Sequence, residues 1–196
     1  MPLSISNPKE RRLLLIDQMS KLSELSIDCK ECNGECCTFV ANSMQITPLE
    51  AVDLYTYCKD NFDRVELLAS LKNCIKEFRL DKMIPTNNRC FMRKSYTCPF
   101  YLRKKLGCSI PNEYKPYGCL AFNPTNVKSK EGQGCYSQIE LLEKRELQFK
   151  EIEQNTNSSI KRELKLWWDK LPVPNALIDI YENFAKDEIT GVTILK

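Results

Sequence analysis

Apolar positions recur at helical spacing in several stretches of the chain, and most of these stretches begin with a recognisable capping sequence. In the first stretch, Asn7 is a typical N-cap and Pro8 suits the first helical position. Apolar residues then recur every three or four positions, which is typical of an amphipathic helix. The pattern predicts a helix over 8–26. Its apolar face consists of Leu15, Met19, Leu22 and Leu25.

Two further helices are predicted between residues 47 and 80. Thr47, Pro48 and Glu50 form the sequence of a capping box with proline in the first turn. Asp63 and Glu66 have the same spacing ahead of a second apolar stripe. The predicted apolar faces are Leu49, Val52 and Tyr55 in the first of these helices, and Leu68, Leu71, Ile75 and Phe78 in the second.

The last sixty residues predict three more helices. Ser137 with Glu140 resembles a helix start, and the polar run 155–159 predicts a break after it. Pro172 is expected to end or bend the second of these helices, and Pro174 to begin the third. The apolar faces are Ile160, Leu164, Trp167 and Leu171 in the second, and Leu177, Ile180, Tyr181 and Phe184 in the third.

The two remaining stretches, 27–46 and 84–136, show no sustained period and hold most of the Gly, Pro, Asn and Cys residues. They predict loops with short strands, of which Phe39–Ile46 is the best candidate. Ordering such loops costs roughly 1–2 kcal/mol of backbone entropy per residue, so an agent that fixes them is expected. Bound metal is the agent that the cysteines suggest.

The predicted fold is therefore mainly α, an irregular α+β class in which helices pack around a cysteine-rich, metal-anchored loop core. Three segments are expected. Residues 1–28 form an N-terminal helical extension and residues 29–136 a metal-binding cysteine domain. Residues 137–196 form helices that pack on the same domain.

Two features of the composition limit the chemistry. The chain of 196 residues has no histidine, which excludes Ser-His-Asp and Cys-His catalysis and every zinc site with a histidine ligand. It has 11 cysteines, an odd number that disulfides cannot fully pair. The N-terminus lacks the apolar region of a secretory signal and no run is long enough to span a membrane, so a cytoplasmic protein is expected. In a reducing cytosol, clustered cysteines are typical of metal or redox sites.

The formal charge of +3 is unevenly distributed. Residues 89–135 hold nine basic and two acidic side chains, a net charge of +7. The favoured interpretation is that these cations compensate thiolate charge, because nearby Lys and Arg lower a cysteine pKa. Nucleic-acid contact through this block is the weaker alternative, since interleaved aromatics imitate a stacking platform. Those aromatics are Phe91, Tyr96, Phe100 and Tyr101.

The first cysteine cluster is a candidate metal half-site. The gap of two residues between Cys29 and Cys32 lets both thiolates bind one ion at about 2.3 Å. Gly34 supplies the permissive backbone that a tight turn needs. Cys36 and Cys37 are adjacent, so they serve either two sites or one site and a free thiol.

The second cluster is Cys98, Cys108, Cys119 and Cys135. Familiar templates do not fit either cluster: a bacterial ferredoxin needs cysteine where Glu35 stands, and a zinc ribbon needs a second two-residue knuckle. Three cysteines lie outside the clusters and are predicted to be structural: Cys58, Cys74 and Cys90. Cys74 lies on the apolar face of its helix, where a cysteine behaves as a small hydrophobe.

The order of these motifs resembles the YkgJ-like cysteine-cluster family of zinc- or iron-chelating proteins, also labelled Fe–S-cluster oxidoreductases. The likeness covers about 29–135 and includes the double cysteine Cys36-Cys37 and the Thr47–Glu50 helix start. Further matching motifs are Cys98-Pro99-Phe100-Tyr101, Gly107-Cys108-Ser109-Ile110, Lys115-Pro116-Tyr117-Gly118-Cys119 and Phe122-Asn123-Pro124. Lys115, Leu120 and Asn123 depart from the usual pattern, the first two at positions where the family often has arginine.

The resemblance implies that eight cysteines bind Zn²⁺ or iron, including a [4Fe–4S] cluster: Cys29, Cys32, Cys36, Cys37, Cys98, Cys108, Cys119 and Cys135. One expected function is a cytoplasmic metal-binding protein with a redox role, as in an Fe–S-cluster oxidoreductase. The alternative is a structural zinc module that binds protein or nucleic acid without catalysis. No catalytic residue is predicted. Glu31, Glu35 and Glu50 are expected to be solvated surface residues rather than proton carriers.

Overall fold

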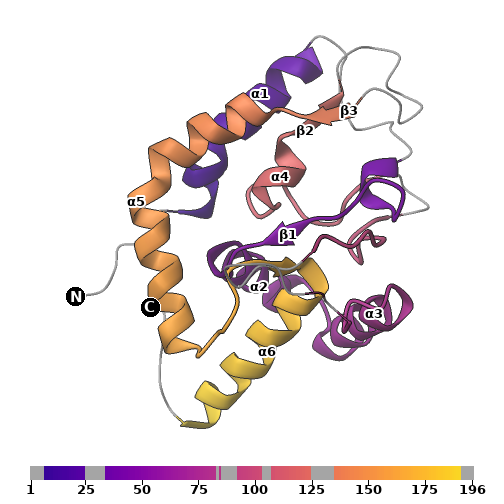
Figure 1. Cartoon of the computed structure of the whole chain (residues 1–196), viewed down its shortest axis with the longest axis vertical. Helices are drawn as coiled ribbons and strands as arrows, with labels where there is room; N and C mark the ends of the chain where they lie inside the picture. The colour runs from indigo at the N-terminus through magenta and orange to yellow at the C-terminus, as the bar shows by residue number, and fades with distance from the viewer. Residues whose placement is uncertain are drawn as a thin grey trace. The chain divides into compact units, whose positions relative to one another are not determined.

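The computed structural model describes residues 7–24, 34–82, 84, 92–102, 107–124 and 135–190, with side chains as far as 184. Within these ranges the fold is mainly helical, with two small antiparallel sheets (Figure 1). The chain divides into two compact units. The first unit comprises Met1–Met44 and Ser95–Gln154, and the second comprises Gln45–Lys94 and Asn155–Lys196.

Each unit combines distant parts of the sequence. The elements of the first unit are α1 (Pro8–Glu24), the 3-10 turn η1 (Glu35–Cys37), α4 (Tyr117–Leu120), β2 (Phe122–Pro124), β3 (Cys135–Ser137) and the beginning of α5 (Ile139–Glu163). Those of the second unit are β1 (Gln45–Ile46), α2 (Pro48–Asn61), α3 (Arg64–Glu77), the end of α5, β4 (Leu171–Pro172) and α6 (Val173–Thr190). None of the helices in the described ranges is both long and apolar enough to cross a membrane.

The core of the first unit lies between α1 and α4. Leu15 of α1 is buried against Leu120 and Ala121, and Leu141 and Leu142 of α5 cover the same cluster. The helix predicted over 8–26 is confirmed as far as Glu24. Its capping prediction is also confirmed, because the Lys9 amide donates to Oδ1 of Asn7 at 2.9 Å.

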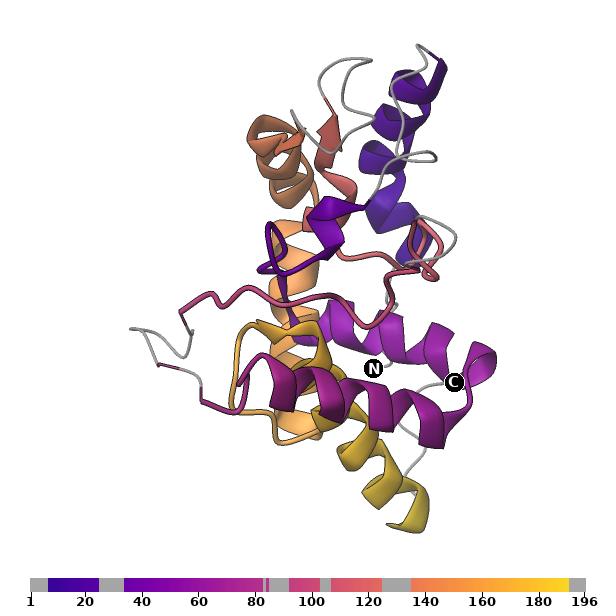
Figure 2. The same ribbon diagram turned by 90° about the vertical axis from the view of Figure 1, so that its right-hand side faces the viewer.

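The second unit is built on α6, which packs against both α2 and α3 (Figure 2). Strand β1 pairs antiparallel with β4, so that Ile46 lies opposite Leu171. Both predicted helix starts are confirmed. The Thr47 hydroxyl accepts from the Glu50 amide while the Glu50 carboxylate accepts from the Thr47 amide, and Asp63 accepts from the Glu66 amide at 2.9 Å.

The apolar face of α3 differs from the prediction. Leu67, Leu71 and Cys74 are buried, whereas Leu68 and Ile75 are only half-buried. Two leucines are adjacent at 67–68, so the sequence allows either to face inward. Packing against α6 decides between them.

The break predicted at 155–159 is wrong, because α5 continues without interruption to Glu163. Two of its polar residues have structural roles within the second unit. Thr156 is buried, and Asn157 accepts through Oδ1 from the Leu49 amide at 2.9 Å. That amide lies in the first turn of α2, where backbone donors lack helical partners. A polar run that looks like a break is therefore partly used to cap another helix.

The helix predicted through Leu171 ends earlier than expected. Lys165 has φ 53°, and the Leu166 amide donates to the Lys161 carbonyl at 2.8 Å, which is a Schellman ending. Trp167 therefore follows the helix, and Leu171 belongs to β4. Glycine is usual at the positive-φ position of this ending. Because Lys165 stands there instead, the sequence did not indicate where the helix ends.

The strand predicted over Phe39–Ile46 is wrong except for its last two residues. The Thr38 carbonyl accepts from the amides of both Ala41 and Asn42, which makes this segment a tight turn. Phe39 and Val40 are exposed at the turn. Their β propensity is overridden by these local hydrogen bonds. The last helix is confirmed as α6, with Leu177, Ile180 and Tyr181 buried.

Candidate cysteine site

The predicted ligands divide into those inside and those outside the described residues. Cys29 and Cys32 lie outside, as does Cys90. The six other predicted ligands all belong to the first unit: Cys36, Cys37, Cys98, Cys108, Cys119 and Cys135.

The adjacent pair Cys36-Cys37 lies on the turn η1. Gly34 precedes this turn with φ 71°, and its carbonyl accepts from the Cys37 amide at 2.8 Å. A Cβ atom at Gly34 would lie 2.4 Å from Cε2 of Tyr101. The position therefore needs glycine both for its left-handed backbone and for close packing on the Tyr101 ring. The permissive backbone predicted at Gly34 is confirmed, at the turn that carries Cys36 and Cys37.

A second loop is hydrogen-bonded to this turn. The Cys98 amide donates to the Cys37 carbonyl at 2.7 Å, and the Tyr101 amide donates to the Cys98 carbonyl at 3.1 Å. Tyr101 in turn forms an antiparallel bridge with Cys108. Backbone contacts thus connect three cysteine-bearing segments that are far apart in the sequence.

The thiols of Cys36 and Cys108 are both affected by neighbouring sulfur atoms. A hydrogen bond with the Cys37 side chain, together with burial, raises the pKa of Cys36 well above its ordinary value, while Lys115 lowers it. Burial raises the pKa of Cys108, and nearby Cys36 raises it further. The Ile110 amide, which donates to the Cys108 sulfur at 3.4 Å, and Lys115 both act in the opposite direction.

Lys115 is therefore a cation that favours the thiolate form of two cysteines. This electrostatic effect supports, for Lys115 alone, the interpretation that the basic segment 89–135 compensates thiolate charge. Thiolate is the form that binds metal.

The last two predicted ligands lie on different elements of the first unit. Cys119 is exposed on α4, where its amide donates to the Pro116 carbonyl at 3.0 Å. Cys135 is half-buried on β3, opposite Pro124 of β2.

The donor chemistry of this region fits a soft metal, but no complete site is formed by the residues that the structure describes. Thiolates suit both zinc and iron. Among the described residues, no three Cys, Asp or Glu side chains are arranged to hold an ion. A closed zinc site needs four ligands. Cys29 and Cys32, which directly precede η1 in the sequence, lie outside the description.

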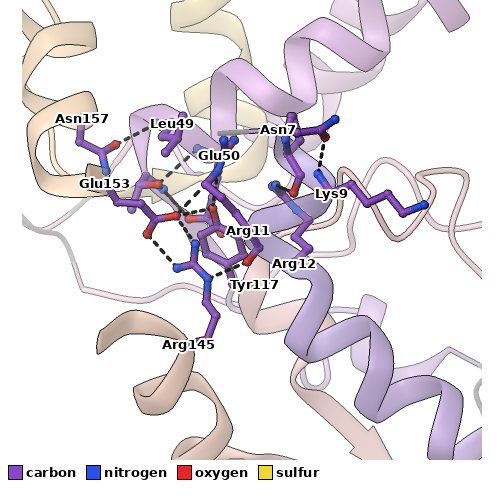
Figure 3. A network of polar contacts seen from close by, with 12 residues as sticks. Asn7, Lys9, Arg11, Arg12, Leu49, Glu50, Tyr117, Arg145, Glu153 and Asn157 are labelled. Atoms are coloured by element: carbon purple, nitrogen blue, oxygen red, sulfur yellow. Dashed lines mark hydrogen bonds and ion pairs between the residues drawn. The ribbon is translucent and has the colours of Figure 1, made fainter. Parts of the chain in front are cut away.

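A buried polar network that the sequence did not predict surrounds Tyr117 (Figure 3). The guanidinium carbons of Arg12 and Arg145 lie 4.7 Å and 3.5 Å from the centre of the Tyr117 ring. The Tyr117 hydroxyl donates to Oε1 of Glu153 at 2.7 Å and accepts from Nε of Arg11 at 3.3 Å. Tyr117 stands two residues before Cys119. The network therefore connects α1 and α5 to the segment that carries a candidate ligand.

The network also reaches Lys115, because Nε of Arg12 donates to the Lys115 carbonyl at 2.7 Å. Arg11, Arg12 and Arg145 are almost fully buried. Arginines are mostly exposed in proteins, so residue type predicts the opposite. In the sequence, only the adjacent pair Arg11-Arg12 early in an amphipathic helix could have indicated that arginines are buried here.

Two sequence interpretations need correction here. Tyr96 and Phe100 are 0% and 3% exposed, so they cannot stack on bases as a nucleic-acid platform requires. Glu50 is not a solvated surface residue, because it is buried and completes the capping box of α2. Phe91 and Glu31 lie outside the described residues, and Glu35 is half-buried on η1.

Cys58 and Cys74 are buried in the second unit, as predicted for structural cysteines. Burial raises the pKa of each thiol from 9.0 to about 12. Neither residue belongs to the cysteine site of the first unit.

The raised pKa values of Cys58 and Cys74 predict that the protein loses stability at alkaline pH. Their stabilising contribution is complete below pH 9.0, and it is lost as pH rises toward about 12, because the unfolded chain releases protons that the folded chain retains. Each thiol should contribute up to about 1.4 kcal/mol per pH unit in this window. Urea unfolding at several pH values should show a shallower alkaline decline in Cys58→Ala than in the wild type. Parallel declines in the two proteins would contradict the prediction.

Comparison with known proteins gives no assignment: no family model, curated protein or solved structure matches this chain significantly.

Proposed function

We propose that this protein is a metal-binding protein whose cysteine cluster chelates zinc or iron. The proposed ligands are drawn from Cys29, Cys32, Cys36, Cys37, Cys98, Cys108, Cys119 and Cys135. The observation that carries the proposal is the set of backbone contacts that joins the Cys36-Cys37 turn to the loops of Cys98 and Cys108. Lys115 lowers the pKa of both Cys36 and Cys108. The resemblance of these motifs to the YkgJ-like family supports the same conclusion.

Electrostatics explains why a cation suits this cluster. A negative charge on one of these sulfurs raises the pKa of its neighbours, so the thiols oppose ionisation together. Lys115 and the Ile110 amide offset only part of this cost. A bound divalent metal would supply the positive charge that keeps several neighbouring sulfurs ionised.

Two forms of the proposal differ in function. With a [4Fe–4S] cluster, the protein would be an oxidoreductase that transfers electrons. With zinc closed by four thiolates, the metal would stabilise the fold of an adaptor that binds another macromolecule. Iron with acid-labile sulfide and a brown colour would indicate the first form, and colourless protein with zinc the second.

The proposal is tested by metal content. Protein purified without oxygen is expected to hold zinc or iron by plasma mass spectrometry. The variant Cys36→Ser/Cys108→Ser should lose most of it, because serine removes two soft ligands. Cys74→Ala is the matched control, since Cys74 is a buried cysteine of the other unit, and it should retain the wild-type content.

A second variant, Cys29→Ser/Cys32→Ser, tests the predicted knuckle separately. Circular dichroism establishes whether each variant is folded. Unchanged metal content in both double variants, or a wild-type protein without metal, would overturn the proposal.

A further inference from the structure

The second unit carries a positively charged groove of about 360 Å³ along α3 and the turn that follows it. We call it the α3 groove. It is lined by Lys72, Ile75, Lys76, Arg79, Asp81 and Lys82. Four of these residues are cationic and one is acidic.

The cations of the α3 groove are not neutralised by the protein. The side chains of Lys72, Lys76 and Lys82 are exposed, and so is that of Arg79. In the part of the chain that the structure describes, none of these four side chains forms an ion pair or hydrogen bond. Lys72 and Lys76 are also four positions apart on one helix, where like charges repel each other. An anion in the groove would relieve this repulsion.

A helix C-terminus normally disfavours anions, because its last carbonyls carry partial negative charge. At the end of α3 two of these carbonyls already accept hydrogen bonds, because the amides of Phe78 and Leu80 donate to the carbonyls of Cys74 and Ile75 at 3.1 Å and 2.9 Å. In the turn that follows α3, Nζ of Lys94 donates to the carbonyls of Arg79 and Lys82 at 2.8 Å and 2.6 Å. Lys94 therefore adds a fifth positive charge beside the groove.

We propose that the α3 groove binds the phosphate backbone of a nucleic-acid duplex without sequence preference. Among the residues that the structure describes, the lining contains no aromatic side chain, which single strands use for stacking, and no Asn or Gln, which read base edges. Ile75 is the only apolar residue among the described lining, so an acidic peptide would find little there to anchor it. A row of unpaired cations is what phosphates require. This site is independent of the cysteine cluster and of any metal there.

The proposal is tested by fluorescence anisotropy with a labelled DNA duplex of about 20 base pairs at several salt concentrations. Four phosphate contacts give an expected slope of log K against log salt near −3.6, a roughly 150-fold loss of affinity between about 50 mM and about 200 mM salt. In Lys72→Gln/Lys76→Gln the slope should fall to about −1.8, a loss of only about 12-fold over the same range. The substitutions are at exposed positions, and circular dichroism checks the fold.

The matched control is Lys144→Gln/Lys150→Gln, which removes the same charge from exposed positions of α5. Its affinity and slope should equal those of the wild type. Equal effects of the two double variants, or no binding at about 50 mM salt, would overturn the proposal. Polyglutamate or phosphatidylserine vesicles that displace the duplex at comparable concentration would show that the partner class is wrong.

Discussion

Replacing Glu153 by alanine is expected to lower the free energy of unfolding by about 3–5 kcal/mol, the usual cost of removing one partner from a buried ion pair. Both carboxylate oxygens of Glu153 accept from the Arg145 guanidinium, one of them from Nη1 at 2.8 Å. The same carboxylate accepts from the Tyr117 hydroxyl and lies 3.8 Å from Nε of Arg11. Its loss removes negative charge from a region where Arg11 and Arg145 are 1% and 3% exposed.

Urea unfolding of Glu153→Ala, Glu153→Gln and Glu146→Ala measures this effect. Glu146 is exposed on the same helix, so its removal should change stability by less than about 0.5 kcal/mol. Glutamine keeps an acceptor for Tyr117 but loses the charge, and an intermediate value is expected. A loss in Glu153→Ala no larger than in Glu146→Ala would show that the network does not stabilise the first unit.

The network gives a physical reason why the cysteine segments need the rest of the first unit. Tyr117 belongs to the cysteine-rich segment 84–136, whereas Arg11 and Glu153 lie outside it. The two outer helices contact this segment through the Tyr117 ring and hydroxyl. Helices from both sides of the cysteine-rich segment thus pack against it, which agrees with the mainly helical fold predicted from the sequence.

The parts of the fold that could be predicted are those determined by neighbouring residues. The starts of α2 and α3 follow from Thr47, Glu50 and Asp63, whose side chains bind backbone amides three positions away or fewer. The continuity of α5 could not be predicted, because Asn157 has its partner at Leu49. Asn157 looks unfavourable within α5, but its side chain accepts a hydrogen bond from the first turn of α2.

The candidate site shows the same division. Gly34 was predictable because a tight turn beside two cysteines needs a permissive backbone. The hydrogen bond from the Cys98 amide to the Cys37 carbonyl joins main-chain atoms of residues sixty-one positions apart. Because it involves no side chain, it cannot be predicted from residue types. Lys115 could be predicted only as one of nine basic residues in its segment. Its position beside Cys36 and Cys108 required the structure.

Replacing Trp168 by alanine is expected to lower the free energy of unfolding by about 3–5 kcal/mol, because it leaves a large cavity in the second unit. Trp168 is 0% exposed, and its indole Nε1 donates to Oδ2 of Asp179 at 2.8 Å. Its neighbour Trp167 is 61% exposed. The sequence analysis placed Trp167 on the apolar face of its predicted helix, and this is wrong, because Trp168 is the buried residue of the pair.

Trp167→Ala is therefore the matched control for Trp168→Ala, with an expected change of less than about 0.5 kcal/mol. Because the chain has 2 tryptophans, each variant retains a single tryptophan, whose emission can be excited selectively for unfolding measurements. Emission from folded Trp167→Ala should lie at shorter wavelength than emission from folded Trp168→Ala, since it comes from the buried indole. Trp168→Phe fills much of the cavity but leaves Asp179 without the indole donor, so its stability should fall between those of the wild type and Trp168→Ala. Equal losses in the two alanine variants would contradict the assignment of Trp168 as the core residue of this pair.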